Sequence, residues 1–140
     1  MGHEIIIYRD SHVLLNDLDL WCLRFFLVVA SAELVNRGSS EGSVLKKYFE
    51  SWEWIGNGVI TNLDLSPILE GKVHMELVYL EVLADTKMIL ESFGEEIPLK
   101  YLNENLINGQ FTFYNRPPKV VSLTALIEKL EDLLQKPVSS

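Results

Sequence analysis

The chain has 140 residues, of which 48% are hydrophobic, and a net charge of −8. This length fits one globular domain, residues 1–140, that can bury a core without disulfides or metals. The acidic balance argues against direct binding to nucleic acid, which depends on clustered Lys and Arg, and against docking on an anionic membrane.

The only cysteine, Cys22, cannot form an intramolecular disulfide, so we expect a cytoplasmic protein. Its neighbours Trp21 and Leu23 predict a buried thiol that behaves as a small apolar side chain. A reactive thiol would need a basic partner, and Arg24 lies only two residues away, on a different side of a helix.

The N-terminal third predicts a strand and a long helix. Residues 4–9 are rich in β-branched side chains, which favours a strand, and residues 10–12 have the chemistry of a turn or cap. Residues 16–36 repeat apolar side chains at three- and four-residue spacing, as an α-helix does. Within it, residues 18–32 are too short to span a bilayer and follow an acidic start unlike a signal peptide, so a buried helix is expected.

The middle of the chain predicts a second helix at residues 43–52, which ends in an aromatic cluster. The cluster contains Tyr48, Phe49, Trp52 and Trp54. Aromatic side chains of this kind either cover a core or anchor an interface with a partner.

A longer helix is expected at residues 72–93, with Gly94 at its C-terminal end. A short helix over residues 98–106, a strand at 110–114 and a last helix over 122–135 follow. The predicted fold is mainly α with a minor β component (α+β), a single compact helical domain in which residues 4–9 and 110–114 form a two-stranded ribbon.

Residues 73–104 form the most unusual segment, because they contain seven carboxylates against two lysines. Glu81 and Asp85, four residues apart on a helix, repel each other unless a partner neutralises them. This segment and the aromatic cluster supply the candidate partner-binding residues: Glu81, Asp85, Glu91, Glu95, Glu96, Glu104, Trp52 and Trp54.

No set of residues predicts catalysis, so we expect a protein that is not an enzyme and has no cofactor, metal or catalytic residue. The strongest arrangement for a metal is His74 with Glu81 or Asp85, without a second histidine or cysteine at ligand spacing. The glycines at 56 and 58 lack the lysine and spacing of a phosphate loop.

Residues 54–104, which include WIGNGVITNLDLSPILEG and FGEEIPLKYLNEN, resemble bacterial toxin-immunity proteins of the contact-dependent growth inhibition type. The resemblance implies a non-catalytic protein that binds one cognate toxin domain and blocks its active site; such toxins are often basic nucleases. No residue role is carried over from it. The alternative is a small dimeric regulatory or small-molecule-binding module that pairs through its first long helix, where Trp21, Phe25 and Phe26 exceed what one core can hide.

Overall fold

A computed structural model describes residues 3–8, 11–52, 62–105 and 117–135. Within these ranges the chain is mainly helical with a small three-stranded sheet, which confirms the predicted α+β class. The elements in chain order are β1 (His3–Tyr8), β2 (Ser11–Asn16), α1 (Asp17–Asn36), α2 (Ser40–Glu50), β3 (Asn62–Asp64), α3 (Ser66–Leu69), α4 (Val73–Glu91), α5 (Leu99–Asn105) and α6 (Val120–Gln135).

The sheet has the strand order β2-β1-β3, with β1 antiparallel to β2 and parallel to β3. Ile6 in β1 is paired with Val13 and with Leu63. Paired residues share one face of a sheet, and these three side chains pack into the core, where Ile6 is fully buried. The sheet therefore presents a short apolar row to the helices.

Two sequence predictions about the sheet are wrong. Ser11 and His12 belong to strand β2 instead of a turn, because they pair with Tyr8 and Ile7 across the hairpin. The predicted ribbon of residues 4–9 with 110–114 is also wrong in its pairing, since both edges of β1 are occupied by β2 and β3. Residues 110–114 themselves lie outside the described residues.

Helix α1 passes through the centre of the molecule and contacts α2, α4, α6 and the strands β1 and β2. Cys22, as predicted, is fully buried. Trp21 and Phe26 are buried within the single chain and Phe25 is half-buried against the core. One chain therefore covers these aromatic side chains by itself, so they give no reason to expect that two copies pair through α1.

In the described part of the chain, no helix combines the length and the apolar character needed to cross a bilayer.

Helices α1 and α2 form a tight hairpin. Gly38, with φ +89°, turns the chain after α1, and the hydroxyl of Ser39 caps α2 by accepting a hydrogen bond of 2.9 Å from the Gly42 amide. A Cβ atom at Gly42 would lie 2.8 Å from the Cβ of Leu34, so glycine permits the close approach of the two helices. Arg24 closes the far end by donating to the carbonyls of Phe49 (2.9 Å) and Glu50 (2.6 Å).

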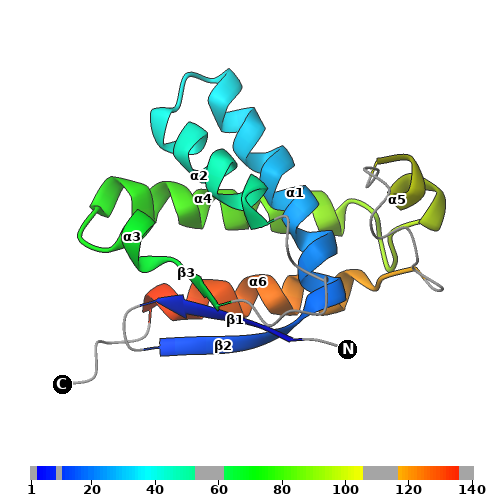
Figure 1. Cartoon of the computed structure of the whole chain (residues 1–140). Helices are drawn as coiled ribbons and strands as arrows, with labels where there is room; N and C mark the ends of the chain where they lie inside the picture. Colours follow the sequence, from blue (N-terminus) through cyan, green and yellow to red (C-terminus); the bar gives the residue numbers. More distant parts are fainter. Residues whose placement is uncertain (1–2, 9–10, 53–61, 106–116, 136–140) are drawn as a thin grey trace.

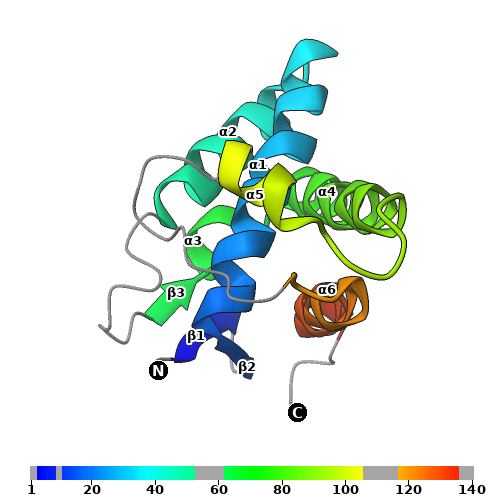
Figure 2. The same ribbon diagram turned by 90° about the vertical axis from the view of Figure 1, so that its right-hand side faces the viewer.

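Helix α4 packs against α1, α2 and α6. Figure 1 shows α6 on one side of α4 and α2 with the end of α1 on the other, and Figure 2 shows α1 between α4 and the sheet. Tyr8 of β1 donates a 2.8 Å hydrogen bond to the carboxylate of Glu76 on α4. Lys87 and Glu128 form an ion pair of 3.3 Å between α4 and α6. Gly94 takes φ +91° beyond the helix, as the sequence predicts for this position.

Candidate functional site

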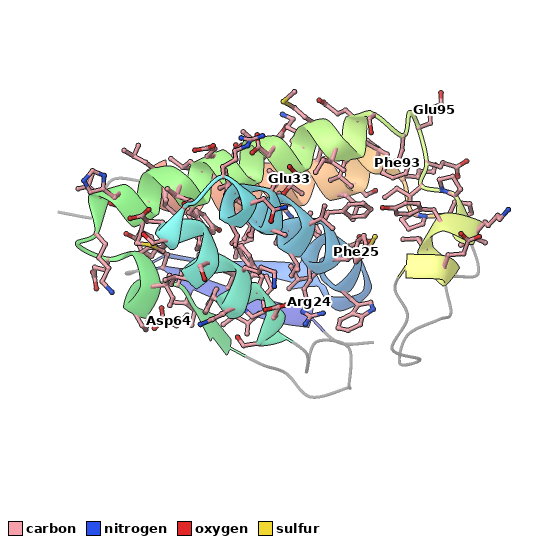
Figure 3. The ribbon with its side chains drawn as sticks, turned by 90° about the horizontal axis from the view of Figure 1, so that it is seen from above. Arg24, Phe25, Glu33, Asp64, Phe93 and Glu95 are labelled. Carbon is pink, nitrogen blue, oxygen red and sulfur yellow. The ribbon has the colours of Figure 1, made fainter. Side chains whose placement is uncertain are left out.

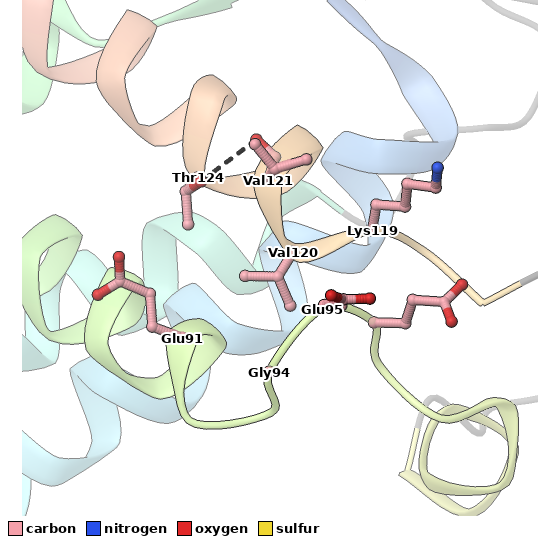
Figure 4. A pocket seen from close by; sticks show the side chains of 8 residues that line it. Glu91, Gly94, Glu95, Lys119, Val120, Val121 and Thr124 are labelled. Carbon is pink, nitrogen blue, oxygen red and sulfur yellow. Dashed lines mark hydrogen bonds between the residues drawn. The ribbon is translucent and has the colours of Figure 1, made fainter.

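Three of the candidate acids come together at a surface cleft where α4 ends and α6 begins. Glu91 belongs to the last turn of α4, and Glu95 and Glu96 follow Gly94. The cleft has a volume of about 600 Å³ and is lined by Glu91, Gly94, Glu95, Glu96, Lys119, Val120, Val121 and Thr124. Figure 4 shows Val120 between Glu91 and Glu95, with Val121 and Thr124 beside each other on α6. We call this region the acidic cleft.

The backbone fixes the position of the two acids that follow α4. Glu96 pairs with Lys119 in an antiparallel bridge. The Val120 amide donates to the carbonyl of Glu95 (2.9 Å), and the Ile97 amide donates to the carbonyl of Pro118 (3.0 Å). These bonds hold the segment after α4 against the segment before α6. A pre-ordered backbone reduces the conformational entropy that binding would otherwise remove.

The side chains of the acidic cleft are available to a partner. Glu91, Glu95 and Glu96 are exposed, and none forms an ion pair or a side-chain hydrogen bond with another described residue. Lys119 provides one positive charge on the same rim. Val121 is 70% exposed, so the cleft also offers an apolar surface. Such a site suits a cationic side chain with an aliphatic stem, because carboxylates bind the charge and the valines pack against the stem.

Asp85 lies in a different place, in a groove between α1 and α4. The groove has a volume of about 400 Å³ and is lined by Val29, Ala30, Glu33, Arg37, Asp85, Met88 and Ile89. Figure 3 shows Glu33 on the side of α1 that faces α4. Neither Glu33 nor Met88 was among the candidate residues from the sequence. Glu33 is 52 positions before Asp85 in the chain, and no local pattern connects them.

The remaining acids are dispersed. Glu81 is exposed on α4, and Glu104 is exposed on α5. Figure 1 places α5 at the end of the molecule where α4 ends and α6 begins, although Glu104 does not line the acidic cleft. Glu76, which belongs to the same acidic stretch, is half-buried and bound by Tyr8, so it serves the interior of the fold.

The aromatic cluster belongs to the core in its described part. Trp52 is 1% exposed and makes edge-to-face contacts with Phe49 and Tyr48, at centroid distances of 5.1 and 5.5 Å. Its assignment as a partner-binding residue is therefore corrected, because its side chain has no surface left to offer. Burial also raises the pKa of Tyr48 to about 12. Trp54 lies outside the described residues.

The metal arrangement considered for His74 gains no support from the described part of the chain. No group of three or more His, Cys, Asp or Glu side chains converges there. His74 itself is exposed at the start of α4.

Searches against protein-family models, curated proteins and solved structures found no match to this chain. The function is therefore inferred from the geometry and charge of the surface.

Proposed function

We propose that this protein is a non-catalytic binding protein of the immunity type, which neutralises a cognate bacterial toxin domain through its acidic surface. The observation that carries the proposal is the meeting of Glu91, Glu95 and Glu96 at a pre-ordered cleft. The toxin domain would be a basic protein, such as a nuclease whose active site binds phosphate. Carboxylates placed over such a site occupy the positions of the phosphates.

Electrostatics supports this kind of partner. A net charge of −8 accelerates encounter with a basic protein and suppresses encounter with acidic ones. Glu91, Glu95 and Glu96 remain free of ion pairs within the described residues, so they need not break an internal bond before they bind. A protein in this role acts in the cytoplasm, the compartment that the lone thiol of Cys22 favours.

The immunity proposal predicts that a neighbouring gene encodes a large secreted protein with a toxin domain at its C-terminus, and the test uses that domain. The variant Glu95→Gln/Glu96→Gln removes two negative charges from the cleft. The control variant Asp132→Lys changes the net charge by the same amount at an exposed position of α6 that lies away from the cleft. Residue 132 is about 18 Å further along α6 than Val120, which lines the cleft. Association kinetics with the toxin domain are measured at two salt concentrations, and protection of cells is measured by co-expression.

We expect the cleft variant to associate several-fold more slowly than Asp132→Lys and to respond less to salt, because it lacks the charges nearest the partner. Both variants should keep the thermal stability of the wild type, since exposed substitutions change it by less than about 0.5 kcal/mol. Equal association rates and equal protection by the two variants would show that Glu95 and Glu96 form only a solvated surface.

A further inference from the structure

The outer face of α4 carries an unusual row of apolar side chains. Val73 is 65%, Leu77 59% and Met88 69% exposed, whereas most large apolar residues of the described chain are buried. Ala84 lies in the same row and is also exposed. Leu77 and Met88 are eleven residues apart, close to three full turns, so their side chains point in nearly the same direction. We call this row, with the acids between its members, the outer seam of α4.

The outer seam has the spacing of a helix–helix contact. Exposed residues recur along it at alternating three- and four-residue steps: His74, Leu77, Glu81, Ala84, Met88 and Glu91. A repeat of 3.5 residues is the pattern by which two helices pack side by side over several turns. The small side chain of Ala84 lies at the middle of the seam, where it allows another backbone to approach closely.

Acids lie along the outer seam and beside it. Glu81 and Glu91 interrupt the apolar row, and Asp85 flanks it on the side of α1. The groove between α1 and α4 continues the seam through Met88 and adds Glu33 from the opposite wall, with Arg37 as the cation beside it. The surface is therefore an apolar strip with carboxylates at Glu81, Asp85 and Glu91. Lys87, the cation next to Met88, is paired with Glu128 on α6.

The charges on the outer seam indicate which kind of partner can bind there. A second copy of the chain would place the acids of one seam against the acids of the other, which is unfavourable. A partner helix with apolar residues on one stripe and Lys or Arg beside it would satisfy both features of the surface. We propose that the outer seam of α4 is the docking site for a basic amphipathic helix of the partner protein, an inference that rests on the proposed function and names the partner's chemistry.

In this arrangement the apolar stripe of the partner covers Leu77, Ala84 and Met88. Its basic side chains reach Glu81, Asp85 and Glu91. Met88 is expected to make the largest apolar contact with the partner, because it belongs both to the outer seam and to the groove between α1 and α4. A methionine side chain also adapts to an incoming surface more readily than branched side chains do. The acidic cleft begins at Glu91, which it shares with the outer seam, and extends the same negatively charged surface.

The first experiment uses a synthetic probe, so it does not depend on knowing the toxin. The probe is a labelled helical peptide of about six turns, with Leu at the seam positions and Lys at the flanking ones; a matched peptide carries Glu in place of Lys. Fluorescence anisotropy measures binding to the wild type, to Leu77→Gln/Met88→Gln, and to the control Val44→Gln, whose parent residue is 44% exposed on α2.

We expect the Lys peptide to bind the wild type and Val44→Gln alike, and the seam variant at least about tenfold more weakly, which corresponds to about 1.4 kcal/mol. The Glu peptide should not bind. Equal binding of the Lys peptide to all three proteins, no binding to any of them, or equal binding of both peptides would overturn the proposal. Sedimentation that shows a dimer of the wild type, lost in Leu77→Gln/Met88→Gln, would also overturn it, because a second copy would then be the occupant.

The second experiment separates this proposal from the proposed function. The same seam variant is tested with the toxin domain beside Glu95→Gln/Glu96→Gln. Faster dissociation from Leu77→Gln/Met88→Gln, with Val44→Gln unchanged, supports the outer seam. If the acidic-cleft variant weakens association while the seam variant binds as the wild type does, the docking helix is refuted and the immunity function stands. If the toxin domain binds none of the proteins although the Lys peptide binds as expected, the immunity function fails and the seam remains a docking surface.

Discussion

The inner and outer faces of α4 both carry apolar side chains, but only those of the inner face are buried. The inner face buries Met75, Tyr79, Val82, Leu83, Thr86 and Leu90. The outer face exposes Leu77 and Met88 between carboxylates. Both faces are rich in apolar side chains, yet only the inner face uses them to stabilise the fold. A helix with apolar side chains on both faces therefore has more hydrophobic surface than this core needs, and the excess is available for a partner.

The largest effect is expected from truncating the inner face. Leu83→Ala removes a side chain that is fully buried, so it should lower the free energy of unfolding by about 2–5 kcal/mol through lost burial and the cavity that remains. Chemical denaturation measures this change. A loss below about 1 kcal/mol would mean that the inner face is loosely packed, and the contrast between the faces would disappear.

The next largest change in stability is expected at the contact between α1 and α2, where the direction of the change shows how closely the two helices pack. Alanine is normally a better helix former than glycine by about 1 kcal/mol. At Gly42, however, a Cβ would lie 2.8 Å from that of Leu34, so Gly42→Ala should destabilise the protein by about 1–3 kcal/mol. Thermal unfolding measures it. If Gly42→Ala is more stable than the wild type, the two helices have room to separate, and the interior is less rigid than described.

The hydroxyl of Tyr79 predicts a smaller effect of opposite sign. It is fully buried on the inner face and has no hydrogen-bond partner among the described residues. Tyr79→Phe should therefore raise the stability by about 1 kcal/mol at neutral pH. A loss of stability at neutral pH would show that the hydroxyl does have a partner.

Tyr79 also predicts how stability depends on pH. Burial raises its pKa above the ordinary value of 10.0, so the folded protein keeps the phenolic proton where the unfolded chain releases it. Ionisation of Tyr79 therefore leaves the stability unchanged below pH 10 and lowers it as the pH rises further, by about 1.4 kcal/mol per pH unit. Denaturation at pH 10 and 11 should show a smaller loss in Tyr79→Phe than in the wild type. Tyr48, whose pKa is also raised, contributes to the loss in both proteins.

The smallest change in stability is expected on the outer face. Met88→Ala removes a side chain that is 69% exposed, so the free energy of unfolding should change by less than about 0.5 kcal/mol. Measured beside Leu83→Ala under the same conditions, it completes the comparison of the two faces. A loss similar to that of Leu83→Ala would place Met88 in the core and remove the basis for the outer seam.

The sequence predicted most helices closely because their signals are local. Helix α4 was expected at residues 72–93 and runs over Val73–Glu91, and Gly94 follows it with positive φ. Strands β2 and β3 were missed for physical reasons. Asn and Asp at the ends of Asn62–Asp64 are unusual in strands, and this short segment depends on pairing with β1, a partner far away in the sequence.

The candidate site was predicted only in part. Spacing along α4 placed the acids on its surface, but their neighbours come from elsewhere. The acidic cleft needs Lys119 and Val120, which the bridge at Glu96 brings to the end of α4. Trp52 was assigned to an interface because aromatic residues suit cores and interfaces alike, and only the packing of α2 against its neighbours decides between the two.

The central position of β1 in the sheet has a consequence for biosynthesis. Strand β1 acquires its parallel neighbour only when residues 62–64 have been made, and the β1–β2 hairpin meets α6 only when residues 120–135 have been made. Contacts between such distant segments slow folding, because a long loop must close before they form. Until then one edge of β1 stays open to other chains, so the nascent protein depends on rapid completion or on chaperones to avoid aggregation.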